Sequence, residues 1–332
     1  MLKVIRNPDV YHGKNKKSNF FEGWYFKLVE PKRGDTYCFI PGIFISDKKE
    51  QSHSFIQVLK GNENNFEYLR YKKDDFRAKT YEFDVSVREN SFSLNEININ
   101  INEQNEKING TLYFHNIIRW PDSVINPGSM GFYNYLGFME CYSQVCAVDG
   151  IIKGSLNING KVVDFTGGKV YIEKNWGKGF PYSYIWVQGN CFKNGDGSVT
   201  CSLGHIPLPF PLRGFTGFLI GIYAKGKFYK FTTINKSVLS IKCEKDKLIL
   251  ESHNKNYFLK VQGQYKKETF MDLYAPYDGT MKPLARETLN GDLIVTLYDK
   301  KKSSIIFEDT CTSAGIEFSK DYISLINRIE RK

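Results

Sequence analysis

The chain has 332 residues, of which 41% are hydrophobic and 25% are charged, so it can bury a sizeable core and is not intrinsically disordered. Its 28 glycines and 11 prolines exclude a collagen-like or low-complexity chain, and its net charge of +10 comes from basic residues scattered along the sequence. Aromatic residues make up 15% of the chain, a high content that is typical of β-strands or of a cavity lined by rings.

The N-terminus has no apolar segment followed by a small-residue cleavage site, so it does not read as a signal peptide. The longest apolar stretch, 215–224, is about half of the ~20 residues needed to cross a bilayer. Seven cysteines without a Cys-x-x-Cys pair favour free thiols in a reducing compartment, and five dispersed histidines argue against zinc. We therefore expect a soluble, cytoplasmic protein without a metal.

Short runs rich in Val, Ile, Phe, Tyr and Thr recur along the chain and predict β-strands, several of them with the period-two alternation of a half-buried strand. In the first half the expected strands are 24–29, 37–45, 53–59, 81–87, 91–94, 97–101 and 110–114. In the second half they are 169–172, 184–192, 215–223, 227–232, 247–252, 257–262 and 292–298. Turn sequences such as Asn-Gly-Asp-Gly at 194–197 separate them, as hairpins require.

Helical periodicity is nearly absent, and only the tail 321–331 predicts a short helix, with four apolar residues on one face. Many short strands at this spacing predict an all-β fold of antiparallel sandwiches or barrels, and the absence of a GxGxxG or P-loop motif argues against a nucleotide-binding sheet. A composition change near 150–160 divides the chain into an N-terminal domain, 1–155, and a C-terminal domain, 156–332.

Two acidic residues stand inside aromatic runs. Glu22 lies in Phe-Phe-Glu-Gly-Trp-Tyr, where burial would raise the pKa of its carboxyl; the alternative is a structural acid held by a salt bridge or hydrogen bond. Glu140 follows a long loop with proline and glycine, 120–139, and looks like a buried acid at the start of a strand. Such a loop either covers a cavity mouth or is a structural crossover.

The segment 164–190 is the richest in polar and aromatic groups. Because residues two apart on a strand share a face, Tyr171, Glu173 and Asn175 should point one way. A second such series consists of Trp186, Gln188 and Asn190. These faces are typical of a cavity wall with a few placed hydrogen-bonding groups, although a buried polar ladder that fixes strand register would look the same.

The sequence gives little support for a serine or cysteine nucleophile or for nucleic-acid binding. The chain lacks a Gly-x-Ser-x-Gly nucleophile motif, and Cys141 and Cys146 have no histidine beside them in sequence, so inert buried thiols are expected. Lysine clusters lie beside turns and no nucleic-acid-binding motif accompanies them, so no nucleic-acid partner is expected.

At these segments the sequence resembles the tocopherol cyclase family. The stretches that carry the resemblance are, in order, YHG, FFEGWYFK, PGSMG, FMECY, DFTGGKVYIEKNWGKGFP, YIWVQGNCF and TCTSAGIEF, and they span almost the whole chain. The resemblance implies two lipocalin-like antiparallel β-barrels, a fold shared with carotenoid hydratase-like proteins, and no organic cofactor or metal. It also implies an isomerase that closes a chromanol ring on a prenylated benzoquinol.

Such a cyclisation begins with a proton delivered to an alkene in a dry pocket, so it needs a protonated acid and aromatic rings that stabilise a carbocation. Glu173 is the first candidate for the acid, followed by Glu22 and Glu140. The candidates for substrate binding are Trp24, Tyr25, Tyr142, Tyr171, Asn175, Trp176, Trp186, Gln188 and Asn190.

Two other functions remain open from the sequence. A lipocalin-like cavity can carry an amphipathic isoprenoid lipid without any chemistry, and related folds support hydration or cycloaddition of polyenes. In each case the partner is an apolar or amphipathic small molecule, a prenylated aromatic or another isoprenoid. The net charge of +10 also fits peripheral contact with an anionic membrane, where such a substrate would reside.

Overall fold

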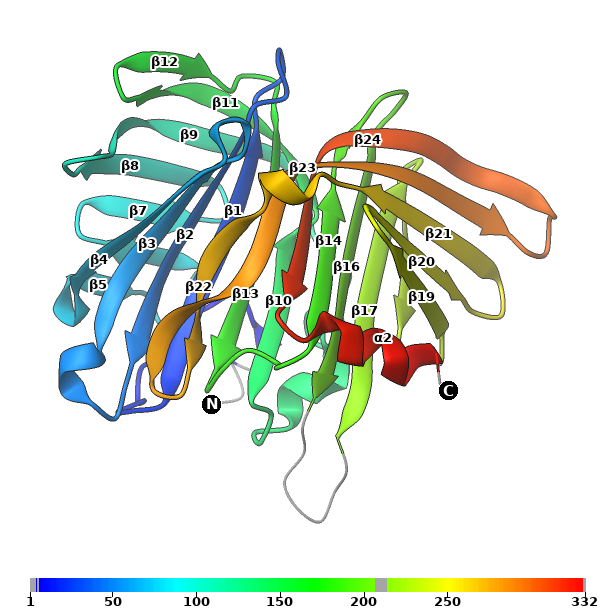
Figure 1. The fold of residues 1–332 in the computed structure, drawn as a ribbon, viewed down its shortest axis with the longest axis horizontal. Helices are drawn as coiled ribbons and strands as arrows, with labels where there is room; N and C mark the ends of the chain where they lie inside the picture. The colour runs from blue at the N-terminus through cyan, green and yellow to red at the C-terminus, as the bar shows by residue number, and fades with distance from the viewer. Residues whose placement is uncertain (1–3, 5, 207–213, 331–332) are drawn as a thin grey trace. The chain divides into compact units, whose positions relative to one another are not determined.

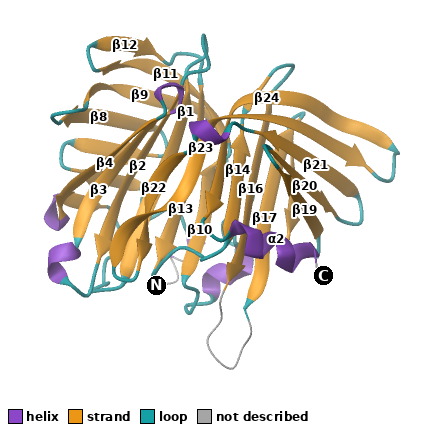
Figure 2. Cartoon of the chain, viewed as in Figure 1, coloured by secondary structure: helices purple, strands orange, loops and turns teal. Residues whose placement is uncertain are grey.

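The computed structural model describes residues 4, 6–206 and 214–330, and β-strands dominate this part of the chain (Figure 2). The strands form two separate sheets, of 13 and 11 strands within the described residues. Neighbouring strands pair antiparallel, as in β-barrels built from successive hairpins. The predicted all-β fold with two antiparallel barrel-like sheets is therefore confirmed.

The first sheet is built from the N-terminal part of the chain. Its strands are β1 (Phe20–Val29), β2 (Thr36–Ile45), β3 (His53–Lys60), β4 (Asn65–Lys72), β5 (Phe76–Ala78), β6 (Asp84–Val87), β7 (Asn90–Ser93), β8 (Glu96–Asn102), β9 (Lys107–Ile118), β10 (Cys141–Ala147), β11 (Asp149–Ile158), β12 (Lys161–Asp164) and β13 (Lys169–Gly177). Their order across the sheet is β4-β3-β2-β1-β13-β11-β9-β8-β7-β6-β5, with β10 beside β13 and β12 beside β11 (Figure 1).

The second sheet follows in the chain. Its strands are β14 (Tyr184–Gly189), β15 (Cys191–Phe192), β16 (Gly197–Ile206), β17 (Phe215–Ala224), β18 (Lys227–Thr232), β19 (Val238–Glu244), β20 (Lys247–His253), β21 (Tyr257–Gln264), β22 (Met271–Tyr277), β23 (Thr280–Asp299) and β24 (Ser304–Ser319). Their order is β18-β17-β16-β14-β24-β23-β21-β20-β19, with β15 beside β24 and β22 beside β23.

Within the described residues, and apart from residues 4 and 6, helical structure is confined to short segments. They are η1 (Lys49–Gln51), η2 (Gly61–Glu63), η3 (Lys73–Asp75), η4 (Gly131–Tyr135), η5 (Lys267–Thr269) and the C-terminal α2 (Tyr322–Glu330). The last of these confirms the predicted helix, whose final residue, 331, lies outside the described part. Leu325, Ile326 and Ile329 bury one face of α2 in the apolar core of the second unit, which explains its 3.6-residue pattern. No helix among residues 4, 6–206 and 214–330 is long and apolar enough to span a membrane.

Contacts divide the chain into two compact units. The first contains Met1–Phe180 together with Tyr274–Pro283, and the second contains Pro181–Leu273 and Leu284–Lys332. The sequence-predicted boundary after residue 155 falls inside β11, whereas the division between units comes after Phe180. The strand β13 therefore belongs with the N-terminal strands, because its whole length pairs with β1.

The segment Tyr274–Pro283 belongs to the first unit for a local reason. The side-chain amide of Gln57 donates to the Tyr274 carbonyl oxygen at 3.1 Å, and its oxygen accepts from the Tyr274 backbone N–H at 2.9 Å. The Tyr274 ring also stacks on Tyr68 with 4.5 Å between ring centroids. A buried amide thus satisfies both backbone groups of one residue more than 200 positions away, a contact that no local pattern in the sequence predicts.

Each unit has its own apolar core, built from alternate residues of its strands. In the first unit, Trp24, Phe26 and Leu28 of β1 point into the core, and in the second, Ile185 and Val187 of β14 do so. Because side chains alternate across a strand, the residues between them lie on the opposite face. This alternation decides which candidate site residues can meet.

Candidate active site on strand β13

Strand β13 carries different polar groups on its two faces. It pairs with β1 on one side and with β10 on the other, and this register places Glu173 opposite Tyr25 and Lys174 opposite Trp24. Glu173 and Lys174 are adjacent in sequence and therefore point to opposite sides of the sheet. We call the groups around them the Glu173 cluster and the Lys174 cluster.

The Glu173 cluster consists of Glu173, Tyr171, Asn175 and Tyr25. The Tyr171 hydroxyl donates to Glu173 Oε2 at 2.5 Å, and the Asn175 amide donates to Glu173 Oε1 at 3.3 Å. The Tyr25 ring lies edge-on to Tyr171, with 6.5 Å between centroids. Glu173 is only 6% exposed. The predicted grouping of Tyr171, Glu173 and Asn175 on one face is confirmed.

This arrangement suits a carboxyl that gives up a proton. Two donors directed at the carboxyl oxygens stabilise the negative charge that remains after the proton leaves. Burial keeps water from competing for the proton or for a cation formed nearby. The rings of Tyr25 and Tyr171 offer electron-rich faces on the same side of the strand. The cluster thus contains the groups that a general acid for an apolar substrate requires.

The Lys174 cluster lies on the other face of β13. The Lys174 ammonium forms an ion pair with Glu22, and both side chains are fully buried. The same ammonium donates to the Val10 carbonyl oxygen at 2.6 Å and lies 3.2 Å from Nδ1 of His12. The backbone N–H of His12 donates to the second Glu22 oxygen at 2.9 Å. These bonds fix the segment before β1 against the strand.

The pKa of Glu22 shows what this ion pair does. Burial alone would raise the pKa of the carboxyl, but the charge of Lys174 and the hydrogen bond from His12 outweigh it and hold the pKa below its ordinary value. Burial, reinforced by Lys174, lowers the pKa of His12, so its ring is neutral near neutral pH. Of the two interpretations of Glu22 that the sequence left open, the structure supports a structural acid held by a salt bridge, and its buried partner is Lys174.

This ion pair should make the stability depend on pH in a definite direction. A carboxyl with a depressed pKa stabilises the fold above its ordinary pKa of 4.5, and this stabilisation is lost as the pH falls through the lower folded value. Urea unfolding of the wild type from about pH 5 down to about pH 3 should show this loss. A Glu22→Gln variant should start less stable and lose less across that range. Parallel curves for the two proteins would contradict the assignment.

Two of the predicted aromatic residues surround the protein's own ammonium. Lys174 Nζ lies 4.6 Å from the ring centroid of Trp24 and 4.7 Å from that of Trp176, which are cation–π distances. Trp176 is stacked between His12 at 4.2 Å and Tyr142 at 5.2 Å. The structure therefore places Trp24, Trp176 and Tyr142 on the face opposite Glu173, although the sequence suggested one common aromatic wall.

Glu140 has a different environment from the one expected. It lies just before β10, and its side chain is exposed, so the expectation of a buried acid at this position is wrong. Its carbonyl oxygen accepts from the Lys178 backbone N–H at 2.8 Å. The Glu140 carbonyl can approach the backbone at 177–178 because residue 177 is glycine. A Cβ at Gly177 would stand 2.1 Å from the Glu140 carbonyl oxygen, and the φ of Gly177 is +146°.

The second unit contains the remaining candidates. Trp186 and Gln188 lie on β14 and Asn190 follows it; all three are buried. Their face is the one opposite the apolar core that Ile185 and Val187 enter. The predicted alternation is confirmed for Trp186 and Gln188, whereas Asn190 lies beyond the end of β14. A substrate role of the three residues remains a prediction.

Two carboxyls on the same face of the second sheet were missed from the sequence. The pairing of β23 with β24 places Glu287 directly opposite Glu317, and β14 places Trp186 opposite Glu317. The Tyr184 hydroxyl donates to Glu317 Oε1 at 2.5 Å, and Glu287 is fully buried. Glu317 stands between apolar residues as Glu22 does, so the same signal could have found it. Glu287 lies among polar residues and gives no such signal.

Gly315 makes room for the Trp186 ring, and a substitution should reveal this. A Cβ at Gly315 would stand 2.6 Å from the Trp186 ring and 3.4 Å from Glu287 Oε1. Gly315→Ala should therefore lower the free energy of unfolding by about 1–3 kcal/mol, as overpacking does. Gly195→Ala is the matched control, since nothing lies within 4 Å of its Cβ position. Urea unfolding of both variants provides the measurement, and equal stability would refute close packing at Gly315.

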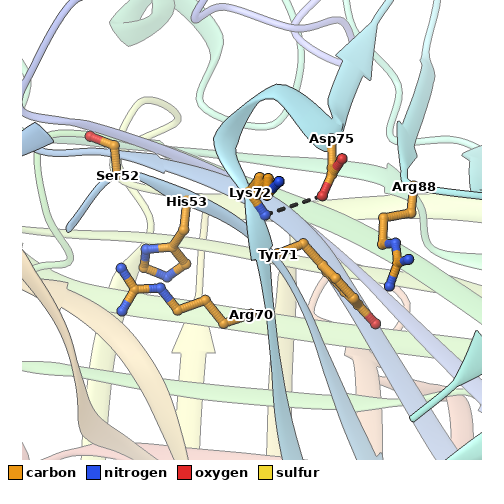
Figure 3. A pocket seen from close by; sticks show the side chains of 7 residues that line it. All are labelled: Ser52, His53, Arg70, Tyr71, Lys72, Asp75 and Arg88. Atoms are coloured by element: carbon orange, nitrogen blue, oxygen red, sulfur yellow. Dashed lines mark hydrogen bonds between the residues drawn. The ribbon is translucent and has the colours of Figure 1, made fainter. Parts of the chain in front are cut away.

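A surface pocket of about 650 Å³ lies elsewhere in the first unit (Figure 3). Its lining residues are Ser52, His53, Arg70, Tyr71, Lys72, Asp75 and Arg88. Figure 3 shows the Arg70 side chain beside the His53 ring, and the Arg88 guanidinium lies 5.4 Å from the centre of the Tyr71 ring. None of the sequence-predicted site residues lines this pocket. Groups of three or more side chains able to hold a metal are absent from the described ranges.

Comparisons with known proteins agree with the sequence motifs. The family model described as tocopherol cyclase-like matches residues 94–319. A rice protein (Oryza sativa subsp. japonica) described as "Probable tocopherol cyclase, chloroplastic" is 24% identical over 370 residues, covering 95% of this chain and 78% of its own length. The maize (Zea mays) protein "Tocopherol cyclase, chloroplastic" matches with the same identity and coverage.

A solved structure shows the same fold at low sequence similarity. The crystal structure of CghA with Sch210972 has a TM-score of 0.54 and 9% identity, and the match covers 90% of this chain and 88% of that one. At this identity the likeness concerns the fold alone. The family model, by contrast, matches about two thirds of the chain and includes all of β13 and β14. The chain therefore belongs to the tocopherol cyclase-like family.

Proposed function

We propose that the protein is an enzyme that cyclises a prenylated benzoquinol or a similar isoprenoid by proton transfer. The observation that carries this proposal is the buried Glu173 carboxyl with donors on both oxygens, Tyr171 and Asn175. Family membership supports it, because the rice and maize relatives are described as tocopherol cyclases.

The proposed reaction is an isomerisation, so substrate and product have the same atoms. Glu173 gives its proton to the less substituted carbon of a trisubstituted alkene, which breaks the π bond and leaves a tertiary carbocation. The phenol oxygen of the same molecule then forms the C–O bond and releases its proton, which returns to the Glu173 carboxylate. Tyr171 and Asn175 stabilise that carboxylate while it is charged, and the rings of Tyr25 and Tyr171 stabilise the cation.

The substrate also suggests where the protein works. A prenylated quinol is held in lipid, so the enzyme must meet it at a membrane or carry it from one, and the net charge of +10 favours an anionic surface. We propose that the protein is peripheral to a membrane on the cytoplasmic side.

The direct test is to incubate the purified protein with a series of prenylated benzoquinols and to analyse the products by mass spectrometry and chiral chromatography. We expect a chromanol that has the same mass as its substrate and is formed with one enantiomer in excess. Solvent extraction of protein from its native host supplies the second measurement. Bound fatty acids or generic lipids, together with no conversion of any quinol, would replace the cyclase proposal with a lipid carrier.

A further inference from the structure

An ordered loop of the first unit holds apolar side chains out into solvent. We call residues 121–140, which precede β10, the apolar loop. Its exposed apolar residues are Val124 at 65%, Ile125 at 76%, Phe132 at 41%, Phe138 at 47% and Tyr135 at 36% exposure. Isolated exposed apolar residues are common on proteins, but five within 15 positions of one loop mark an interaction surface.

The exposure does not come from a loosely held backbone. The Ser129 N–H donates to Gln144 Oε1 at 2.8 Å, and the Asn134 amide donates to the Pro127 carbonyl oxygen at 2.6 Å. The Tyr142 hydroxyl donates to the Leu136 carbonyl oxygen at 2.5 Å. The loop is thus tied to β10 and to itself at several points, and its apolar side chains point outward although the backbone is fixed.

Basic residues flank this loop. The exposed Lys178 is bonded through its backbone N–H to the last loop residue, Glu140. Arg119 precedes the loop and is half-exposed, with its guanidinium paired with Asp9. Lys14, Lys16 and Lys17 are also exposed, and they follow His12, which stacks on Trp176. Trp176 in turn stacks on Tyr142, the residue that holds the loop at Leu136. Apolar side chains beside lysines are typical of surfaces that contact anionic lipid.

We propose that the apolar loop is the membrane-contact surface of the protein, with Val124, Ile125, Phe132 and Phe138 entering an anionic bilayer. The net charge of the protein favours an anionic bilayer over a second copy of the chain as the partner of this loop. Two copies of net charge +10 repel each other, whereas an anionic membrane attracts the protein. The inference deepens the proposed function, because it names the surface by which the enzyme reaches a lipid-dissolved substrate. Lipid binding itself requires no turnover and can be measured separately.

Flotation with vesicles tests the proposal. The wild type should bind vesicles of phosphatidylcholine mixed with phosphatidylglycerol, should bind pure phosphatidylcholine less, and should be released by high salt. A Val124→Asp/Ile125→Asp double variant should bind about tenfold more weakly or worse. Val162→Asp is the matched control, since Val162 is 68% exposed on β12 of the same unit, and it should bind within about twofold of the wild type.

Insertion can be read directly from fluorescence. All four native indoles are at most 6% exposed, so an Ile125→Trp variant adds an indole whose environment is distinct from theirs. Its emission should shift to the blue on vesicle binding and should be quenched by brominated lipids. A matched Val162→Trp variant should show neither change.

Three results would overturn the proposal. They are a wild type that binds neither vesicle, an aspartate double variant that binds like the wild type, and a concentration-dependent dimer that the double variant abolishes. Urea unfolding of each variant shows that it is folded. Because Glu173→Gln should bind vesicles normally, loss of lipid binding and loss of the proposed acid give different patterns.

Discussion

Glu173→Gln should lower turnover of a prenylated quinol by about 10²–10⁴-fold, which is the range that a general acid contributes. The amide has the same shape and can still accept a hydrogen bond from Tyr171, but it has no acidic proton to give. The free energy of unfolding should therefore stay close to that of the wild type. Steady-state kinetics together with urea unfolding measure both quantities.

Graded variants separate a chemical role from a structural one. Tyr171→Phe removes a donor that stabilises the Glu173 carboxylate, so it should slow turnover by about 10–100-fold without abolishing it. Glu140→Gln changes an exposed carboxyl and should leave turnover unchanged. Full cyclisation by the Glu173→Gln protein would exclude this acid and would direct attention to Glu287, the fully buried carboxyl of the second unit.

Lys174→Met should lower the free energy of unfolding by about 3–5 kcal/mol, the usual cost of breaking a buried ion pair. The substitution removes the cation beside Glu22 and leaves that carboxylate buried without its ammonium. It also removes the donor that holds the Val10 carbonyl oxygen. Denaturant unfolding at neutral pH should show a lower midpoint, and the loss should shrink at acidic pH, where Glu22 becomes protonated.

Two comparisons make this prediction specific. A Glu22→Gln/Lys174→Met double variant should recover part of the lost stability, because no unpaired charge remains buried. Lys79→Met removes a lysine that is 59% exposed and paired with Glu82 and Asp84 at the surface, and it should leave the unfolding midpoint unchanged. If Lys174→Met and Lys79→Met behaved alike, the ion pair with Glu22 would not be a stabilising element.

The fold could be predicted from local pattern wherever a strand is continuously apolar or alternates clearly. The predicted strand 215–223 is β17 (Phe215–Ala224) almost residue for residue, because its run of Phe, Leu, Ile and Tyr is characteristic of a strand. By contrast, β16 was missed, since its sequence GSVTCSLGHI is rich in small and polar residues. Its strand conformation comes from pairing with β14 and β17 on both sides, which is long-range information.

In the candidate site, too, local pattern predicts the residues that share a strand but not the contacts between distant strands. Alternation along one strand was enough to place Tyr171, Glu173 and Asn175 together. It could not show that Lys174, on the other face, finds Glu22, a residue 152 positions earlier in the chain. The sequence therefore left open whether Glu22 has a raised pKa or is held by a salt bridge, and only the structure identifies Lys174 as its partner.

The contact between Gln57 and Tyr274 bears on how the protein is made. During synthesis the N-terminal strands leave the ribosome first, and domains generally fold in the order in which they emerge. The first unit, however, includes Tyr274–Pro283, so it lacks a partner for the Gln57 amide until residues 181–273 of the second unit have been translated. We expect residues 1–180 expressed alone to be an incomplete barrel, and the nascent first unit to wait for this late segment before it reaches its final structure.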